Sequence, residues 1–279
     1  ASPYDAFILE EDGKLTEQIL TEYIGMNLSY APRVWNASSA KKANEMIENR
    51  FFDLIIVMMR ISDMDPIKFN KKLKEKFPKK PILLLAFDQS EIKNVSVPNQ
   101  KIFDEIFIWS GNSNVFPAII KCIEDKRNIS KDIKTANIRT ILFIEDTPKF
   151  YSSILPILYK EIIYNTKQLI NKSLNSSQKL LHMRARPKII LIKNFEEAKA
   201  YIKKYRKNIL GIISDLRFPH KQKSTLLAGI QLLKYLEKKN STIPFILQST
   251  EKNISSISNK YSVKIINKNS PTLFKDLRD

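Results

Sequence analysis

Gly211-Ile-Ile-Ser-Asp215-Leu-Arg217-Phe-Pro219 is the stretch from which the fold can be inferred. Its apolar part is typical of a buried parallel strand, and it ends at the carboxylate of Asp215. Pro219 follows four residues later, where it prevents the strand from simply continuing. Because ligands bind beyond the carboxyl ends of strands in open α/β sheets, Asp215 is a candidate site residue. An Asp that begins a turn or caps a helix is the alternative interpretation.

The second half of the chain alternates apolar runs of this kind with helical patterns. Strands are predicted at 140–144, 188–192, 209–214, 244–248 and 263–267. Helices are predicted from 148, over 195–207, 226–239 and 254–260, and from 271. Strands separated by such helices are typical of βαβ units around a parallel sheet.

The first half repeats this order of elements. Strands are predicted at 5–9, 34–35, 53–57, 81–85 and 106–109, and helices at 15–27, 40–49, 67–77 and 115–127. Periodicity is weak over 128–138, which places the domain boundary there. The sequence therefore predicts an internal duplication in an α/β fold, with one domain over 1–133 and a second over 134–279.

Composition limits the classes of function. The chain has 279 residues, of which 43% are hydrophobic and 27% charged. No apolar run approaches the roughly 18 residues that span a bilayer, so we expect a cytoplasmic protein with no membrane partner. One Cys and two His provide neither an internal disulfide nor a plausible zinc site.

The net charge of +18 is unevenly distributed. Residues 1–135 hold 20 Lys and Arg against 19 Asp and Glu, whereas residues 136–279 hold 27 against 10. This asymmetry is consistent with an acidic partner or with solubility alone. Most of these cations are Lys on the polar faces of helices, so nucleic-acid binding is the weaker alternative. A helix-turn-helix or zinc-finger pattern is absent from the sequence.

Polar side chains follow the predicted strands of the second half. Glu145 and Asp146 follow the first strand, Asp215 the third, Ser249 the fourth and Lys268 the fifth. In a doubly wound sheet these positions converge on one edge. Three carboxylates so close need a cation, and hard oxygen ligands suit Mg²⁺. The chemistry this favours is phosphoryl transfer to a carboxylate, with charge neutralised by the metal and a lysine.

The second half resembles the receiver domain of two-component response regulators. The matching stretches are Phe-Ile-Glu145-Asp146-Thr-Pro148, Ile-Ile-Ser-Asp215-Leu-Arg217, Pro244-Phe-Ile-Leu-Gln-Ser249 and Ile-Asn-Lys268. The resemblance implies a flavodoxin-like fold, with a five-stranded parallel sheet in the order 2-1-3-4-5 flanked by helices. It also implies that a histidine kinase or phosphotransfer protein donates a phosphoryl group to Asp215.

The resemblance also implies roles for the other site residues. Asp146 would bind Mg²⁺ directly together with Asp215, Glu145 would bind it through water, and the backbone carbonyl of Arg217 would be a further ligand. Ser249 would be the hydroxyl switch, and Lys268 the ion-pair partner of the acyl phosphate. Two departures from the pattern are Asn269, in place of the usual Pro, and Ile265, in place of the aromatic half of the switch.

The first half is similar to a degenerate receiver. Met58 stands where the phosphoacceptor is expected, Ala86 at the hydroxyl position and Trp109 at the lysine position. Glu10 and Glu11 keep the acidic corner, either as a residual cation site or as solvated acids. This half is therefore expected to be a pseudo-receiver, used for packing or partner binding and not phosphorylated.

The pairing of the two halves looks like the amino-terminal region of large bacterial proteins. These proteins join two receiver-like domains to a phosphoenolpyruvate/pyruvate-binding module similar to phosphoenolpyruvate synthase. The matching stretches are Tyr4-Asp-Ala-Phe-Ile-Leu-Glu-Glu-Asp-Gly13, Phe150-Tyr-Ser-Ser-Ile-Leu-Pro156, Met183-Arg-Ala-Arg-Pro-Lys188 and Leu247-Gln-Ser-Thr250. We therefore expect a non-enzymatic signalling segment whose last helix is truncated and whose output domain lies beyond Asp279. A second copy of this chain, in a homodimer, is a further candidate partner.

Alternatives remain at the sequence level. The chain could be the regulatory fragment of a phosphoenolpyruvate synthase-like phosphotransferase, a basic nucleic-acid-binding module, or a scaffold that is never phosphorylated. The second half also carries extra residues at about 161–187, which predict an elongated first helix and an exposed loop. The basic stretch Arg184-Ala-Arg186-Pro187-Lys188 in it is either solvated or an anion site.

Overall fold

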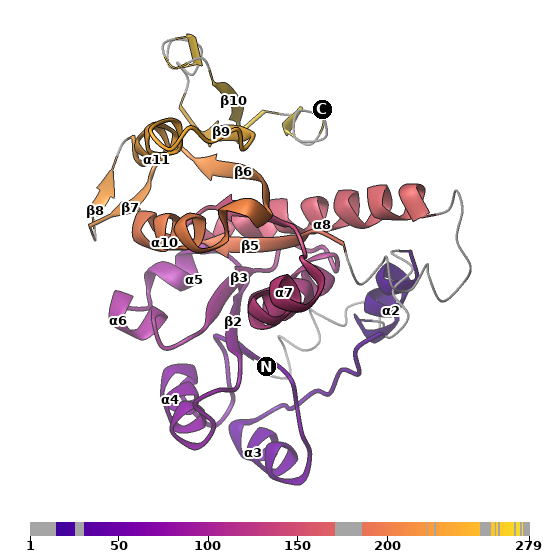
Figure 1. Ribbon diagram of the computed structural model, residues 1–279. Coiled ribbons are helices and arrows are strands. Elements are labelled where there is room, and N and C mark those ends of the chain that lie inside the picture. The colour runs from indigo at the N-terminus through magenta and orange to yellow at the C-terminus, as the bar shows by residue number, and fades with distance from the viewer. Residues whose placement is uncertain are drawn as a thin grey trace. The chain divides into compact units, whose positions relative to one another are not determined.

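Two units make up the chain in the computed structural model, and each is described by itself. One unit comprises Ala1–Ile120 with Tyr151–Pro156, and the other Lys121–Phe150 with Ile157–Asp279. The structure describes residues 15–25, 31–170, 186–221, 223–225, 227–251, 258–259, 261, 263–270, 272–273 and 275. Both units are mixed α/β and contain parallel sheets with helices (Figure 1).

The first unit is built around a three-stranded parallel sheet in the order β1-β2-β3. Its strands are β1 (Ile55–Met58), β2 (Ile82–Ala86) and β3 (Glu105–Ile108). Its helices are α2 (Leu15–Gly25), α3 (Ala40–Asn49), α4 (Pro66–Lys76), α5 (Gln89–Lys93) and α6 (Val97–Gln100). All five residues of β2 are buried, as expected for the central strand of a parallel sheet.

Local sequence explains where these helices begin. The side chains of Ser39, Asp65 and Asp88 accept hydrogen bonds from the first free backbone N–H groups of α3, α4 and α5. Pro66 then occupies the first helical position of α4, where its missing N–H has no cost. The strand predicted at 34–35 is wrong, because residues 31–37 are neither strand nor helix. Val34 and Trp35 are both exposed and pack too little for a buried strand.

The second unit contains a sheet of five strands. Its strands are β4 (Thr140–Ile144), β5 (Lys188–Ile192), β6 (Ile209–Asp215), β9 (Phe245–Ser249) and β10 (Lys264–Asn267). A separate two-stranded hairpin is formed by β7 (Phe218–His220) and β8 (Lys223–Thr225). Its helical elements are α7 (Val115–Ala136), α8 (Pro148–Ile170), α10 (Phe195–Tyr205), α11 (Ala228–Glu237) and the short 3-10 helix η1 (Arg206–Asn208). Helices α7 and α8 carry residues of both units.

Strand order in this sheet is β10-β9-β6-β4-β5, and all four neighbouring pairs are parallel. Counted along the unit, the order is 2-1-3-4-5, as the sequence predicts for the second half. The direction of winding reverses between β4 and β6, so the crevice at their carboxyl ends is the expected ligand site. For the first half, the order stays a prediction because residues 5–9 lie outside the described residues.

The core of the second unit fills one face of this sheet. Alternate residues of β4, β5 and β6 pack there against α10 and α11, and they include Leu142, Ile190 and Ile212. Ile129, on the carboxyl half of α7, belongs to the same cluster. Residues 128–136 are therefore helical, and α7 continues past its predicted end at 127. The domain boundary placed at 128–138 stays a prediction.

Several other expectations can be compared with the structure. Helix α8 has 23 residues, which confirms the elongated helix. The hairpin β7–β8 was not expected, since Pro219 suggested only the end of a strand. The loop at 171–185, the acids Glu10 and Glu11, most of the helix predicted at 254–260 and most of the final helix from 271 lie outside the described residues. None of the described helices is both long enough and apolar enough to cross a membrane.

Candidate functional site

The carboxyl ends of four neighbouring strands carry the polar residues of the second unit. Glu145 directly follows β4, Asp215 is the last residue of β6, Ser249 the last of β9, and Lys268 directly follows β10. Because these strands are parallel and adjacent, their ends share one edge of the sheet. The predicted positions of these residues at one edge are therefore observed.

Lys268 links two carboxylates at this edge. Its Nζ atom lies 2.5 Å from Oε2 of Glu145 and 2.7 Å from Oδ2 of Asp215. All three residues are buried, with exposed fractions of 7% for Lys268, 0% for Glu145 and 6% for Asp215. The ring of Phe150 lies 4.4 Å from Nζ and adds a cation–π contact. The ammonium group is therefore fixed beside Asp215.

Asp146 completes an acidic cluster that could hold a metal ion. Glu145, Asp146 and Asp215 each offer one ligand atom, and these atoms all lie within 4.8 Å of one another. Three carboxylates against one lysine leave excess negative charge, which a divalent cation would neutralise. Asp146 is only partly buried, so a bound cation could keep water ligands on that side. The donor set therefore fits Mg²⁺.

Burial and mutual repulsion perturb these carboxyl groups. Burial, opposed by Lys268 and reinforced by the charge of Asp215, raises the pKa of Glu145 to about 7. Burial and the charge of Asp215 raise the pKa of Asp146 to about 6. The pKa of Asp215 is also raised by burial, against the effect of Lys268. Protons and a divalent cation therefore compete for the cluster near neutral pH.

Ser249 and the loops beyond the strands frame the cluster. The hydroxyl of Ser249 accepts a hydrogen bond from the backbone N–H of Glu251 at 3.0 Å, which leaves its own proton available as a donor. The side chains of Arg217 and Glu251 form an ion pair between the loops after β6 and β9. The role of the Arg217 carbonyl as a metal ligand stays a prediction.

Gly229 allows α11 to approach the loop after Asp215. Its N–H donates to the carbonyl of Leu216 at 3.1 Å. A Cβ atom at this position would lie 2.5 Å from the backbone oxygen of Asp215 and 2.6 Å from a methyl group of Leu247. Only glycine fits this contact without displacement, so it contributes to the position of Asp215.

The first unit places apolar residues at the equivalent edge of its own sheet. Met58 ends β1, Ala86 ends β2 and Trp109 follows β3. The N–H of Trp109 donates to the carbonyl of Ala86 at 2.7 Å, just as the N–H of Lys268 donates to that of Ser249 at 2.8 Å. The three residues predicted to replace aspartate, hydroxyl and lysine thus occupy corresponding positions in a parallel sheet.

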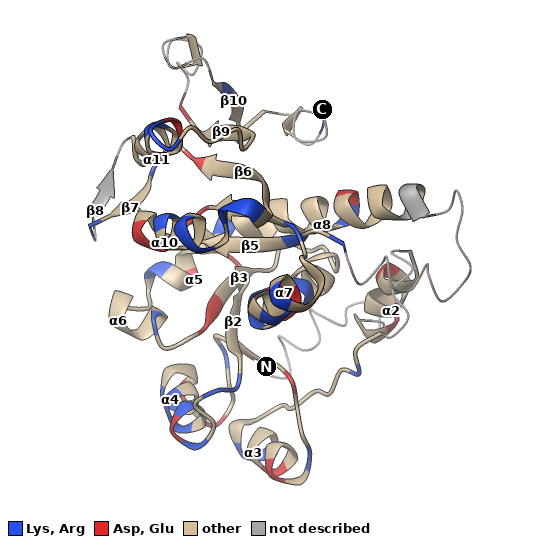
Figure 2. Ribbon diagram, viewed as in Figure 1, with Lys and Arg blue, Asp and Glu red and all other residues tan. Residues whose placement is uncertain are grey.

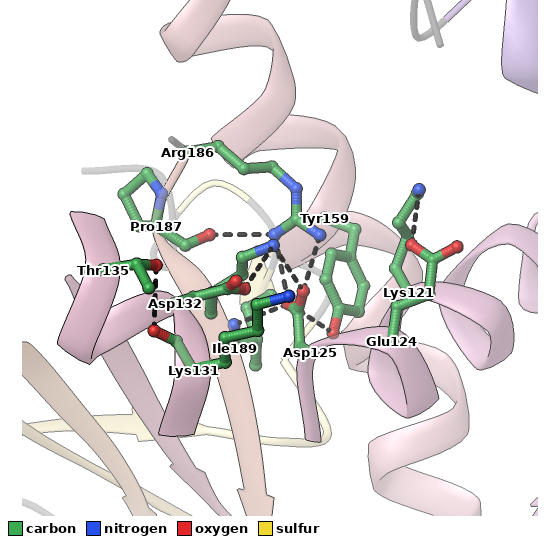
Figure 3. A network of polar contacts seen from close by, with 11 residues as sticks. Lys121, Glu124, Asp125, Lys131, Asp132, Thr135, Tyr159, Arg186, Pro187 and Ile189 are labelled. Atoms are coloured by element: carbon green, nitrogen blue, oxygen red, sulfur yellow. Dashed lines mark hydrogen bonds and ion pairs between the residues drawn. The ribbon is translucent and has the colours of Figure 1, made fainter. Parts of the chain in front are cut away.

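A second buried polar cluster in the second unit was not expected. Asp125 on α7 binds Arg186 through two hydrogen bonds of 2.8 and 3.1 Å, and it accepts others from Tyr159 and from the N–H of Ile189 (Figure 3). Arg186 is 4% exposed, so the alternative in which this residue is solvated is wrong. Sequence offered little signal for this cluster, because Asp125 and Arg186 are 61 positions apart.

Comparisons with known proteins give little further information. No protein-family model and no curated protein matches the chain. One solved structure with similarity is a two-component system response regulator/GGDEF domain protein, at 12% identity and a TM-score of 0.33, with 95% of this chain and 90% of that chain covered.

Another similar structure is NtrX from Brucella abortus in complex with ATP, at 9% identity and a TM-score of 0.27. The match covers 95% of this chain and 63% of NtrX. Both TM-scores are below 0.5, so neither likeness assigns a family or a function to this chain.

Proposed function

We propose that this chain is a signalling module of two-component type. Residues 134–279 would form a Mg²⁺-dependent receiver whose Asp215 accepts a phosphoryl group from a histidine kinase or phosphotransfer protein. Residues 1–133 would form a receiver-like domain without phosphoacceptor function. The observation that supports this most is the ammonium group of Lys268 held between Glu145 and Asp215, with Asp146 in reach of the same metal ion.

The geometry supports the following division of work. A carboxylate oxygen of Asp215 attacks the phosphorus atom and an O–P bond forms, while the P–N bond to the donor histidine breaks and its electron pair stays on the ring nitrogen. The leaving group is a neutral imidazole whose other ring nitrogen carries the proton. Lys268 neutralises charge on the phosphoryl oxygens, and Ser249 donates a hydrogen bond to one of them. A Mg²⁺ ion held by Glu145, Asp146 and Asp215 would supply further charge neutralisation.

The acceptor role is a half-reaction driven by the donor, so we propose acceptance and not turnover as the activity of these residues. The same proposal includes the domain boundaries given above and the presence of an output domain. A receiver acts through another element, and an output domain in the same polypeptide would be the simplest recipient of the signal.

The test is Mg²⁺-dependent labelling of the purified chain with acetyl phosphate, read by intact mass. We expect one added phosphoryl group, which is lost in Asp215→Asn and after removal of divalent cations. Absence of both labelling and a fluorine NMR signal for bound beryllofluoride would contradict the proposal and favour a scaffold.

A further inference from the structure

Gln248, the fourth residue of β9, has a buried side-chain amide that the chemistry above does not use. The residue is fully buried. Within the part of the chain that the structure describes, neither its Oε1 nor its Nε2 atom has a hydrogen-bond partner. A buried amide left unpaired destabilises the folded state, because it loses its hydrogen bonds to water and gains none in the protein.

Strand register places this amide beside the acidic cluster. Gln248 pairs with Asp215 of β6 on one side and with Ile266 of β10 on the other. Paired residues of adjacent parallel strands present their side chains to the same face of a sheet, so Gln248 shares a face with Asp215. Lys268 follows β10 yet contacts Asp215 on β6, so its side chain crosses the end of β9, where Gln248 lies.

The first unit shows that the fold does not need an amide here. There, Met58 pairs with Leu85 as Asp215 pairs with Gln248. Leu85 is 1% exposed, so an apolar side chain fills the equivalent site. The amide thus occurs in the half with the charged cluster, and leucine in the half without it.

Lys268 has more hydrogen-bonding capacity than the two carboxylates use. An ammonium group donates three hydrogen bonds, and Glu145 and Asp215 accept two of them. A divalent cation at the acidic cluster would compete for Glu145 and weaken its hold on Lys268. The ammonium group would then need another acceptor to stay beside Asp215.

We propose that Gln248 is a positioning residue that keeps Lys268 directed at the phosphoryl group when a cation occupies the acidic cluster. Its Oε1 atom accepts from the Lys268 ammonium group, and its Nε2 atom remains free to donate to an oxygen of Asp215. This inference rests on the proposed phosphoacceptor function. It predicts that Gln248 affects binding of the anion and not binding of the metal.

The test compares Gln248→Leu, which copies Leu85, with the wild-type chain. We measure Mg²⁺ affinity by calorimetry, beryllofluoride affinity by fluorine NMR, and the rate of labelling by acetyl phosphate. We expect Mg²⁺ affinity within about twofold of wild type, and beryllofluoride affinity and labelling rate both lower by about tenfold, the equivalent of one hydrogen bond to a charged group. Stability should be unchanged or higher, because an unpaired buried amide is removed.

A packing control separates this role from a general loss of structure. Ile190→Val trims a buried residue of β5 in the same sheet and should lower the midpoint of urea unfolding without changing the two affinities. Equal beryllofluoride affinity in Gln248→Leu and wild type would overturn the inference while leaving the proposed function intact. A wild-type chain that binds neither Mg²⁺ nor beryllofluoride would overturn both.

Discussion

At the scale of single residues, the candidate site is a balance of buried charges. Glu145 and Asp215 share one ammonium group, and Asp146 adds a third carboxylate to the cluster. The metal-free site is therefore poised to take up either protons or a divalent cation. This competition has a consequence for stability.

We expect the free energy of unfolding of the metal-free protein to fall as pH rises from about 4 to about 7. Glu145 has its pKa raised to about 7 and Asp146 to about 6, so in this window the folded state holds protons that the unfolded chain has released. The contribution of these two groups to the free energy of unfolding is therefore fully present below the ordinary carboxyl pKa. It is lost as the pH rises above their raised pKa values. Urea unfolding at pH 5 and pH 8 measures the difference.

Mg²⁺ should reverse this trend, because it stabilises the ionised cluster. The gain in melting temperature on adding Mg²⁺ should therefore be larger at pH 8 than at pH 5. Backbone and side-chain hydrogen bonds lower the pKa values of Asp63, Asp88 and Glu196, so stability from these groups is lost only as pH falls below the ordinary carboxyl range. A pH profile that is the same in Glu145→Gln as in wild type would contradict the assignment.

Gly229 offers a test of how far backbone packing positions Asp215. Gly229→Ala places a Cβ atom against the oxygen of Asp215, so we expect a loss of about 1–3 kcal/mol of stability and slower labelling. Gly211→Ala is the matched control in the same unit, since its Cβ would meet Pro244 at an ordinary 3.6 Å. Equal effects of the two substitutions on stability and labelling would show that the close approach is not a constraint.

Sequence predicted five residues of the site but not Gln248. Glu145, Asp146, Asp215, Ser249 and Lys268 all follow or end apolar runs, where the topology of a parallel sheet converts sequence position into spatial position. The sequence alone does not predict a role for Gln248, because its burial and its pairing depend on the register of β9 with β6 and β10.

At the scale of elements, a buried polar cluster of the second unit joins helix α7 to β5, the strand at one edge of the sheet. Asp125 on α7 binds Arg186, which precedes β5, and the N–H of Ile189 within β5. Tyr159 brings α8 into the same cluster. One carboxylate therefore fixes three elements that are far apart in sequence.

We expect Asp125→Ala to lower the free energy of unfolding by about 3–5 kcal/mol, because Arg186 would remain buried without its partner. Asp132→Ala is the control. Oδ2 of Asp132 lies 3.6 Å from Nζ of Lys188, and the Asp132 side chain is partly exposed. Its removal should therefore lower the free energy of unfolding by less than about 1 kcal/mol. Denaturant unfolding of both variants measures the contrast. Costs of similar size would show that the Asp125 cluster is not a buried anchor.

Elements with a clear apolar period were predicted closely, and those defined by packing were not. Strands β4 and β5 have the predicted bounds, since continuous apolar runs define them. Helix α7 extends nine residues past the predicted end at 127, because Ile129 and Ile133 pack against the core although the surrounding pattern is weak. The hairpin β7–β8 depends on pairing of two three-residue strands, which sequence alone does not specify.

At the scale of the whole chain, the strands of each unit pair in corresponding registers, but the side chains at the strand ends differ between the units. Met58, Ala86 and Trp109 stand where Asp215, Ser249 and Lys268 stand in the other unit. Lys and Arg are spread over several helices, including α4, α7 and α10 (Figure 2). The difference between the units therefore lies at the strand ends, where the proposed chemistry would occur.

Restoring the aspartate alone should not create a second phosphorylation site. Met58→Asp puts a carboxylate at a position that is 3% exposed, at the end of β1. At the same edge of the sheet, Ala86 ends β2 and Trp109 follows β3, and these residues supply neither a hydroxyl nor an ammonium group. We expect no labelling by acetyl phosphate in the double variant Met58→Asp with Asp215→Asn, and a loss of at least about 2 kcal/mol of stability. Met58→Leu, the control for volume, should cost less than about 1.5 kcal/mol. A phosphoryl group on the double variant would show that the first unit retains a working site, because a carboxylate at the end of β1 would then suffice without the partners that surround Asp215.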